Sequence, residues 1–108
     1  MKVFNVKTKR RETFDPAKHV GMFICLWQHR QALVCKLLGR SKIIGLGWSK
    51  DHERNLLFLF PKTGEVMSCN WDSTCYPKVF ESEEECDKLR VSINLEHTEW
   101  KDSLTNDS

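Results

Sequence analysis

The sequence predicts an α+β fold, mainly an antiparallel β-meander of about five to seven strands, with one short C-terminal helix. A sheet that partly closes on itself is compatible with this prediction. Three observations lead to this prediction. An apolar run at 56–60 ends at Pro61 and is followed by a glycine-containing turn, which indicates a hairpin. Apolar segments alternate with turns about every ten residues through the middle of the chain. Ser82 and Glu85 form a capping box, the signature of a helix N-terminus.

One domain accounts for the length of the chain. It has 108 residues, of which 40 % are apolar, and this is enough to build a hydrophobic core. We expect a single globular domain over 1–100 and a flexible polar tail over 101–108.

Composition also indicates the compartment. The N-terminus lacks the apolar segment of a signal peptide, and no apolar stretch approaches the roughly 20 residues of a membrane span. The five cysteines are an odd number, which disfavours a secreted disulfide scaffold. We therefore expect a cytoplasmic protein without membrane contact, in a bacterium or, for a viral protein, in the host cell.

The first residues predict a strand and a basic loop. Residues 2–8 alternate apolar and polar side chains, with β-branched and aromatic members, which predicts a first strand. Residues 7–11 are almost all lysine or arginine, and such a run is typical of a solvated loop or of a phosphate-binding segment.

Residues 15–39 support two interpretations. Asp15 as N-cap, Pro16 at the first helical position and apolar side chains at helical spacing predict a long helix at 16–38, packed on a smaller sheet. However, Gly21 lies inside that segment and its apolar residues are mostly β-branched or aromatic. We favour two strands, 20–27 and 32–38, joined by a loop at 28–31, although this loop has no glycine, asparagine or aspartate.

The central part of the chain continues the meander. A turn at 39–42 leads to a strand at 43–48, in which two glycines allow a bulge. A polar connection at 49–55 precedes the apolar run 56–60, which we expect to be a strand covered on both faces. Gly64 supplies the left-handed position of the turn, and 66–71 returns as the partner strand.

The C-terminal third begins with an irregular loop at 72–77. The capping box predicts a short helix over 83–89, whose N-terminus is stabilised by the three glutamates 83–85. Alternating apolar and polar residues then predict a final, half-buried strand over 91–97.

The net charge of +2 conceals an uneven distribution. Residues 1–50 contain eleven of the 17 lysines and arginines but only two acids, so this half carries +9, and the other half carries −7. Such polarity predicts either two surfaces for different partners or two halves that attract each other within the fold.

Catalytic and metal-binding motifs are weak in this sequence. Cys69, Cys75 and His97 are the nearest approach to a zinc site, and their spacing does not match the usual ligand pairs. Residues 51–53 resemble an acid–base group but lie in a polar turn. Phosphate-binding, dinucleotide-binding and serine-nucleophile motifs do not occur. We therefore expect no enzyme, catalytic residue, metal or cofactor, and keep a metal-free ribonuclease as a third alternative.

Two binding functions remain. The first is a protein-binding module, such as a phage or viral inhibitor of a host protein, that docks on a basic or nucleic-acid-binding protein. Its expected acidic and aromatic surface comprises Trp71, Asp72, Tyr76, Glu83, Glu84, Glu85 and Trp100. The alternative is an RNA- or DNA-binding protein that uses the basic half. Its expected contact residues are Lys7, Lys9, Arg10, Arg11, Arg30, Arg40, Lys42 and Trp48.

Overall fold

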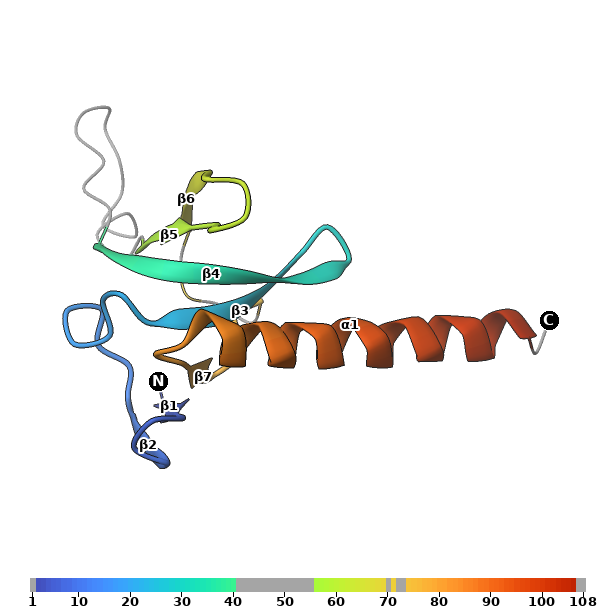
Figure 1. The fold of residues 1–108 in the computed structure, drawn as a ribbon, viewed down its shortest axis with the longest axis horizontal. Coiled ribbons are helices and arrows are strands. Elements are labelled where there is room, and N and C mark those ends of the chain that lie inside the picture. Colours follow the sequence, from blue (N-terminus) through green and yellow to red (C-terminus); the bar gives the residue numbers. More distant parts are fainter. Residues whose placement is uncertain (1, 41–55, 70, 72–73, 107–108) are drawn as a thin grey trace.

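The computed structural model describes residues 2–40, 56–69, 71 and 74–106, and it shows two sheets and one long helix (Figure 1). One sheet has the order β2-β1-β7 and the other the order β3-β4-β5-β6. Neither closes into a barrel, and the predicted α+β class is confirmed. The bounds are β1 Lys2–Asn5, β2 Arg10–Thr13, β3 Phe23–Gln28, β4 Gln31–Arg40, β5 Leu56–Leu59, β6 Val66–Cys69, β7 Lys78–Val79 and α1 Glu83–Asn106.

The region 15–39 forms a hairpin, so the alternative of a long helix at 16–38 is wrong. Where the helix was predicted to begin, the chain forms only a turn, in which the Ala17 N–H donates to the Asp15 carboxylate. β3 and β4 pair antiparallel up to Gln28 opposite Gln31, which leaves a two-residue connection instead of the expected four. His29 and Arg30 adopt φ of 52° and 64°, as a tight hairpin turn requires.

The hairpin of β5 and β6 confirms the strongest sequence signal. The N–H of Gly64 donates to the Phe60 carbonyl over 2.8 Å, and Gly64 has the expected positive φ of 76°. β5 alternates buried Leu56 and Phe58 with half-buried neighbours, so one of its faces is covered less completely than we predicted. The bulge in this sheet lies between Leu37 and Gly39 of β4, whereas the strand predicted at 43–48 lies outside the described residues.

The N-terminal strand is shorter than predicted. β1 ends at Asn5 and pairs antiparallel with β2, so Arg10 and Arg11 belong to a strand and not to the solvated loop that we expected for 7–11. The tight connection between the strands is possible because Lys9 adopts a left-handed φ of 58°.

The two sheets meet along β3. The Trp27 N–H donates to the Thr74 carbonyl over 2.8 Å, and the Cys25 carbonyl accepts from Tyr76 over 3.0 Å. Phe23 and Phe80 form a further bridge with reciprocal main-chain bonds. The same segment, 74–80, then gives β7, which pairs parallel with β1. This segment is therefore the seam that joins both sheets.

Helix α1 is 24 residues long, so the predictions of a short helix over 83–89 and a strand over 91–97 are wrong. The capping box forms as expected, because the Glu85 N–H donates to the Ser82 hydroxyl over 3.4 Å. The apolar and aromatic side chains at 86, 89, 93 and 97 are buried or half-buried and recur at helical spacing. Val91 and Leu95, which suggested a strand, are 47 % and 58 % exposed. The helix continues to Asn106, within the segment expected to be a tail.

Two clusters of buried side chains form the core. The larger one lies between the sheets and is centred on Phe58, Ile24 and Leu37. The smaller one lies beneath α1 and contains Cys25 and Cys86, with Leu89 and Ile93 packed against it. Among the described residues, no helix is long and apolar enough to cross a membrane.

Candidate functional site

The register of the three-stranded sheet places an aromatic side chain between two cations. Phe4 of β1 lies opposite Arg11 of β2 and beside Lys78 of β7. Directly paired residues project from the same face of a sheet, so these three side chains form one row. With strands about 4.8 Å apart, the two charged residues are separated by about 10 Å at their Cα atoms.

Helix α1 and the seam turn this face into a concave surface. A cavity of about 430 Å³ lies between the sheet and the helix, and we call it the basic groove. Its lining residues are Lys2, Phe4, Arg11, Tyr76, Pro77, Lys78, Leu89 and Ile93. Leu89 and Ile93 belong to one face of α1 because they are four residues apart. Among the residues that the structure describes, three cations and no carboxylate line this groove, and its volume is in the range of ligand sites.

Local contacts hold the polar groups of the basic groove. The Lys2 ammonium donates to the Thr13 hydroxyl across β1 and β2 over 3.1 Å. Partial burial raises the pKa of the Tyr76 phenol above its ordinary value of 10. Tyr76 therefore stays neutral at physiological pH and keeps its O–H as a donor. The groove can accept an apolar or aromatic group and an anion at the same time.

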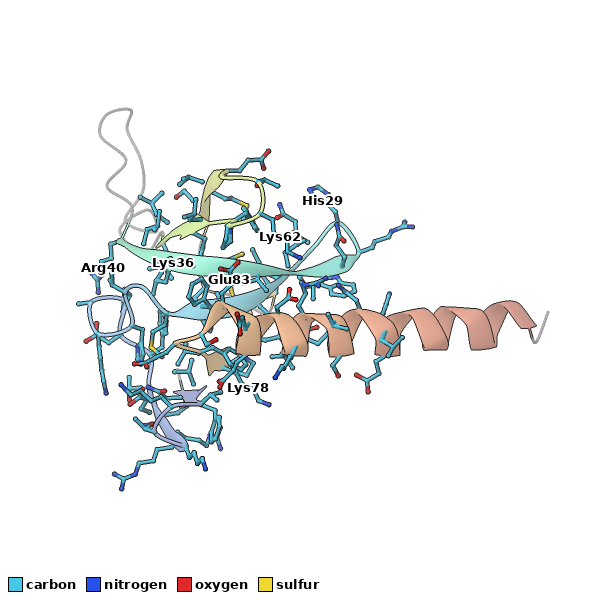
Figure 2. The ribbon with its side chains drawn as sticks, in the orientation of Figure 1. His29, Lys36, Arg40, Lys62, Lys78 and Glu83 are labelled. Carbon is cyan, nitrogen blue, oxygen red and sulfur yellow. The ribbon has the colours of Figure 1, made fainter. Side chains whose placement is uncertain are left out.

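The residues predicted to contact nucleic acid are dispersed. Of the members of this set that the structure describes, only Arg11 lines the basic groove, whereas Arg10 lies opposite Asn5 on the other face of the sheet. Lys9 occupies the turn before β2, and Lys7 forms an ion pair with Glu81 over 3.0 Å. Arg30 lies in the turn just before β4, and Arg40 is the last residue of β4. At about 3.3 Å per residue, the Cα atoms of these two arginines are about 33 Å apart. Figure 2 shows Lys78 below the start of α1 and Arg40 at the far end of β4.

Two residues of that set, Lys42 and Trp48, lie outside the described part of the chain.

The residues predicted to bind a protein partner do not gather either. Trp71 packs against Phe14, with ring centroids 4.3 Å apart. Tyr76 lines the basic groove together with Lys2, Arg11 and Lys78, although the charge of Glu96 also acts on it. The three glutamates 83–85 are exposed in the first turn of α1. Asp72 lies outside the described residues, as does the side chain of Trp100.

A second polar cluster joins β2 to the turn at 16–21. Glu12 accepts hydrogen bonds from Lys18 over 2.8 Å, from His19 over 2.9 Å and from Asn5 over 2.7 Å. These donors, Lys18 first, lower the pKa of Glu12 to about 2. His19 is fully buried and its other ring nitrogen lies 3.1 Å from the Asp15 N–H, so no substrate can reach it. This cluster is structural.

Two thiols meet beneath α1. The sulfurs of Cys25 and Cys86 lie 3.7 Å apart and both residues are fully buried. A hydrogen bond from Cys86 lowers the pKa of the Cys25 thiol and raises that of Cys86. Burial keeps this pair away from substrates. In the described ranges, no group of three histidine, cysteine, aspartate or glutamate residues is arranged to hold a metal ion.

Sequence reasoning found Arg11 and Tyr76 of the basic groove but missed its other six residues. Phe4 and Lys78 are more than 70 positions apart, and only the parallel pairing of β1 with β7 brings them together. The one available signal was the alternation at 2–8, which puts Lys2 and Phe4 on the same face of a strand.

Comparisons of the chain with protein-family models, with curated proteins and with solved structures found no match.

Proposed function

We propose that this protein is a non-enzymatic binding module that holds single-stranded nucleic acid in the basic groove. The row of Arg11, Phe4 and Lys78 supports the proposal, because it offers a stacking surface for a base between two cations for phosphates. Lys2 supplies a third charge, and Tyr76 supplies a second aromatic ring with a hydroxyl donor. The proposed location is the cytoplasm, where thiols such as Cys25 and Cys86 stay reduced.

The shape of the groove favours a single strand over a duplex. Phe4 and Tyr76 are partly buried in a concavity that is walled by Leu89 and Ile93 of α1. In a duplex the faces of the bases are stacked on one another, so they cannot enter such a groove. An unstacked base can enter it while its flanking phosphates stay at the charged rim.

The competing occupant is an acidic peptide with an apolar side chain, for which the same cations and aliphatic walls are suitable. The original hypothesis of an acidic surface for a basic partner receives less support. It expected the aromatic and acidic residues to form one surface, whereas Trp71 packs on Phe14 and Tyr76 lines the basic groove.

The test is fluorescence anisotropy with a labelled oligothymidylate of about 20 nucleotides, measured over a series of salt concentrations. Three phosphate contacts predict that log Kobs falls with log[salt] with a slope of about −2. Phe4→Leu removes the stacking surface and should weaken binding about tenfold, with the slope unchanged. Lys78→Gln removes one contact and should reduce the magnitude of the slope by about 0.7. Arg40→Gln is the matched control, because Arg40 is exposed at the distant end of β4.

Two results would contradict the proposal. One is the absence of binding at low salt, and the other is an equal loss of affinity in Lys78→Gln and Arg40→Gln, which would mean that the groove is not the site. If a peptide of alternating leucine and glutamate bound more tightly than the oligonucleotide and lost affinity in Phe4→Leu, the groove would belong to a protein partner.

A further inference from the structure

Strand β4 extends past its neighbour β5 and leaves part of its edge without a partner strand. β4 pairs with β3 along its whole first half, from Gln31 onward. Its pairing with β5 begins only at Lys36, opposite Leu59. Pro61 follows two residues later, and because it has no N–H it cannot continue the ladder. Residues 31–35 of β4 therefore have one edge that β5 does not cover.

The hydrogen bonds of β3 show which main-chain groups point to this edge. Cys25 and Trp27 bond to the seam on the far side of β3, so their partners in β4 are not hydrogen-bonded pairs. Those partners are Val34 and Ala32, whose N–H and C=O groups must point away from β3. Asn94 of α1 occupies the position at Ala32, accepting from its N–H over 2.7 Å and donating to its C=O over 3.1 Å.

The edge at Val34 borders a second cavity. This cavity has a volume of about 490 Å³. It is lined by Arg90 of α1, whereas Leu89 and Ile93 of the same helix line the basic groove. Leu33 and Val34 of β4, Phe60 and Met67 of the β5–β6 hairpin, and Arg90 of α1 are among its lining residues. Within the described ranges, no main-chain hydrogen bond outside the strand ladders involves Val34. We call this cavity the edge pocket.

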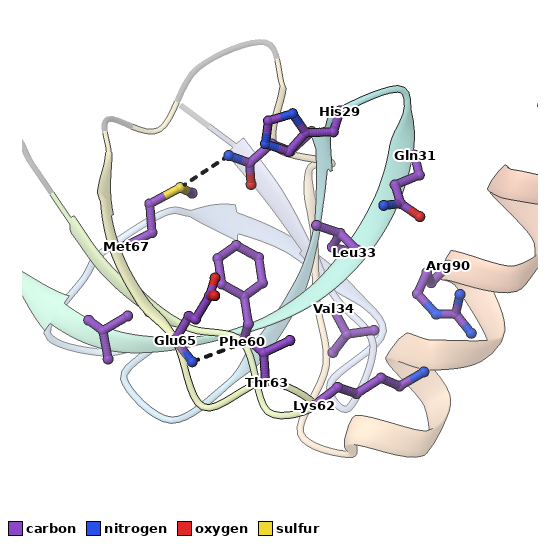
Figure 3. Close-up of a pocket in the computed structure, with 12 residues that line it drawn as sticks. His29, Gln31, Leu33, Val34, Phe60, Lys62, Thr63, Glu65, Met67 and Arg90 are labelled. Atoms are coloured by element: carbon purple, nitrogen blue, oxygen red, sulfur yellow. Dashed lines mark hydrogen bonds between the residues drawn. The ribbon is translucent and has the colours of Figure 1, made fainter.

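Positive charge gathers at the helix end of the edge pocket. Figure 3 shows Lys62 extending from the hairpin turn toward the helix that carries Arg90, and Val34 on the neighbouring strand β4. Both cations contact the carboxylate of Asp87, which lies 2.6 Å from Arg90 and 3.6 Å from Lys62. The three side chains together therefore carry one net positive charge. Glu65 lines the pocket from the hairpin, and an anionic ligand is therefore expected at the Arg90 end.

The rim of the edge pocket contains backbone strain. His29 lines the pocket and adopts a left-handed φ of 52°, followed by Arg30 at 64°. Glycine or asparagine normally occupies these positions in a two-residue hairpin turn. These φ values belong to the two-residue turn between β3 and β4, and this turn forms part of the rim of the edge pocket.

We propose that the edge pocket binds the C-terminal end of an extended peptide from a partner protein. The peptide main chain pairs with the N–H and C=O of Val34, as in strand addition. Its carboxylate lies at Arg90 and Lys62, and its last side chain is apolar and fills the space beside Phe60 and Met67. Within residues 31–35 of β4, only Val34 presents main-chain groups to this edge, because Asn94 occupies Ala32 and the pairing with β5 begins at Lys36. A single residue can pair with the end of a peptide chain, but it is too short an edge for the middle of an added strand.

The experiment is a titration of the ¹⁵N-labelled protein with a pool of acetylated tripeptides that end in leucine, valine or phenylalanine. The Val34 amide signal is expected to move, with dissociation constants between about 0.1 and 1 mM for so small a ligand. The same peptides with a C-terminal amide should bind at least tenfold more weakly. Arg90→Gln and, separately, Lys62→Gln should weaken binding about three- to tenfold, whereas Glu65→Gln should strengthen it.

The Lys62 side chain is exposed, so we expect Lys62→Gln to fold. This variant therefore still tests the carboxylate site if Arg90→Gln does not fold. Arg40→Gln is the charge-matched control and should leave binding unchanged. The proposal is overturned if the Val34 signal does not move at 10 mM peptide, or if the amidated peptides bind equally well. Phe4→Leu should not alter peptide binding, so the result is independent of the nucleic-acid proposal.

Discussion

At the scale of single residues, Glu12 is the carboxylate that ties β2 to the turn at 16–21. It lies on β2, and its carboxylate accepts hydrogen bonds from three side chains, including the buried His19. His19 in turn stacks on Phe14, with ring planes 6° apart, and Phe14 contacts Trp71. A carboxylate thus fixes the turn at 16–21 against the aromatic edge of the core.

Acid should unfold the protein partly through Glu12. Its pKa is about 2 in the folded chain and 4.5 in the unfolded chain, so the folded state favours the ionised form. The stability that this group contributes is fully present above pH 4.5 and is lost as the pH falls toward 2. We expect Glu12→Gln to lower the melting temperature at pH 7 and to flatten the dependence of unfolding free energy on pH between 4.5 and 2. Urea unfolding at several pH values measures this.

Glu96→Gln serves as the comparison for Glu12→Gln, because Glu96 is exposed on α1. This variant should keep the acid dependence of the parent protein. A Glu12→Gln variant with the same slope as its parent would show that the three hydrogen bonds do not favour the ionised carboxylate.

At the scale of elements, the turn between β3 and β4 is shaped against the preferences of its residues. His29 and Arg30 both have side chains that disfavour the left-handed region, at a cost of about 1 kcal/mol or more each. Replacing them with asparagine and glycine should raise the free energy of unfolding by about 1 kcal/mol, which chemical denaturation can measure.

The same double variant also probes the edge pocket. If the strained rim positions His29 for a ligand, the stabilised variant should bind the tripeptide pool more weakly than the parent protein. A loss of stability in the variant would mean that His29 and Arg30 make contacts that outweigh their backbone cost.

Local patterns predicted hairpins better than they predicted the helix. The β5–β6 hairpin was identified because Pro61 and Gly64 limit the backbone itself. The end of the helix was missed because Val91, Ile93, Leu95 and His97 satisfy a two-residue period and, in part, a helical one. Only packing distinguishes the two: Ile93 and His97 face the sheet, and His97 contacts Trp27 at 4.8 Å between rings.

The binding surfaces could be predicted only in part, for a similar reason. Charge asymmetry directed attention to the basic half, which contains Lys2 and Arg11 of the basic groove. The third cation, Lys78, comes from the acidic half, and it reaches the groove through main-chain pairing with β1. The edge pocket depends on how far one strand extends past another, which no local pattern records.

At the scale of the whole molecule, α1 is both a wall between two cavities and an extension beyond the sheets. Its 24 residues span about 36 Å, and the longest dimension of the molecule is 51 Å. Figure 1 shows its first half lying along β3 and β4 and its second half projecting past them. The radius of gyration, 15.6 Å, exceeds the roughly 13 Å of a compact chain of this length.

Removal of residues 99–108 should therefore leave the body intact. We expect the free energy of unfolding to change by less than about 0.5 kcal/mol, because Ile93 and His97, the packed residues, are retained. Oligothymidylate binding should also keep its salt slope. A large drop in melting temperature would show that the projecting segment stabilises the fold.

The seam at 74–80 also determines when the fold can be completed during synthesis. β1 and β2 form a two-stranded ribbon whose remaining partner, β7, is synthesised about 65 residues later. At typical elongation rates of about 5 to 20 residues per second this delay is roughly 3 to 13 s. A nascent chain must keep its first hairpin from pairing with other strands for that period, since Phe4 and Asn5 gain their second strand partner only after Lys78 and Val79 emerge.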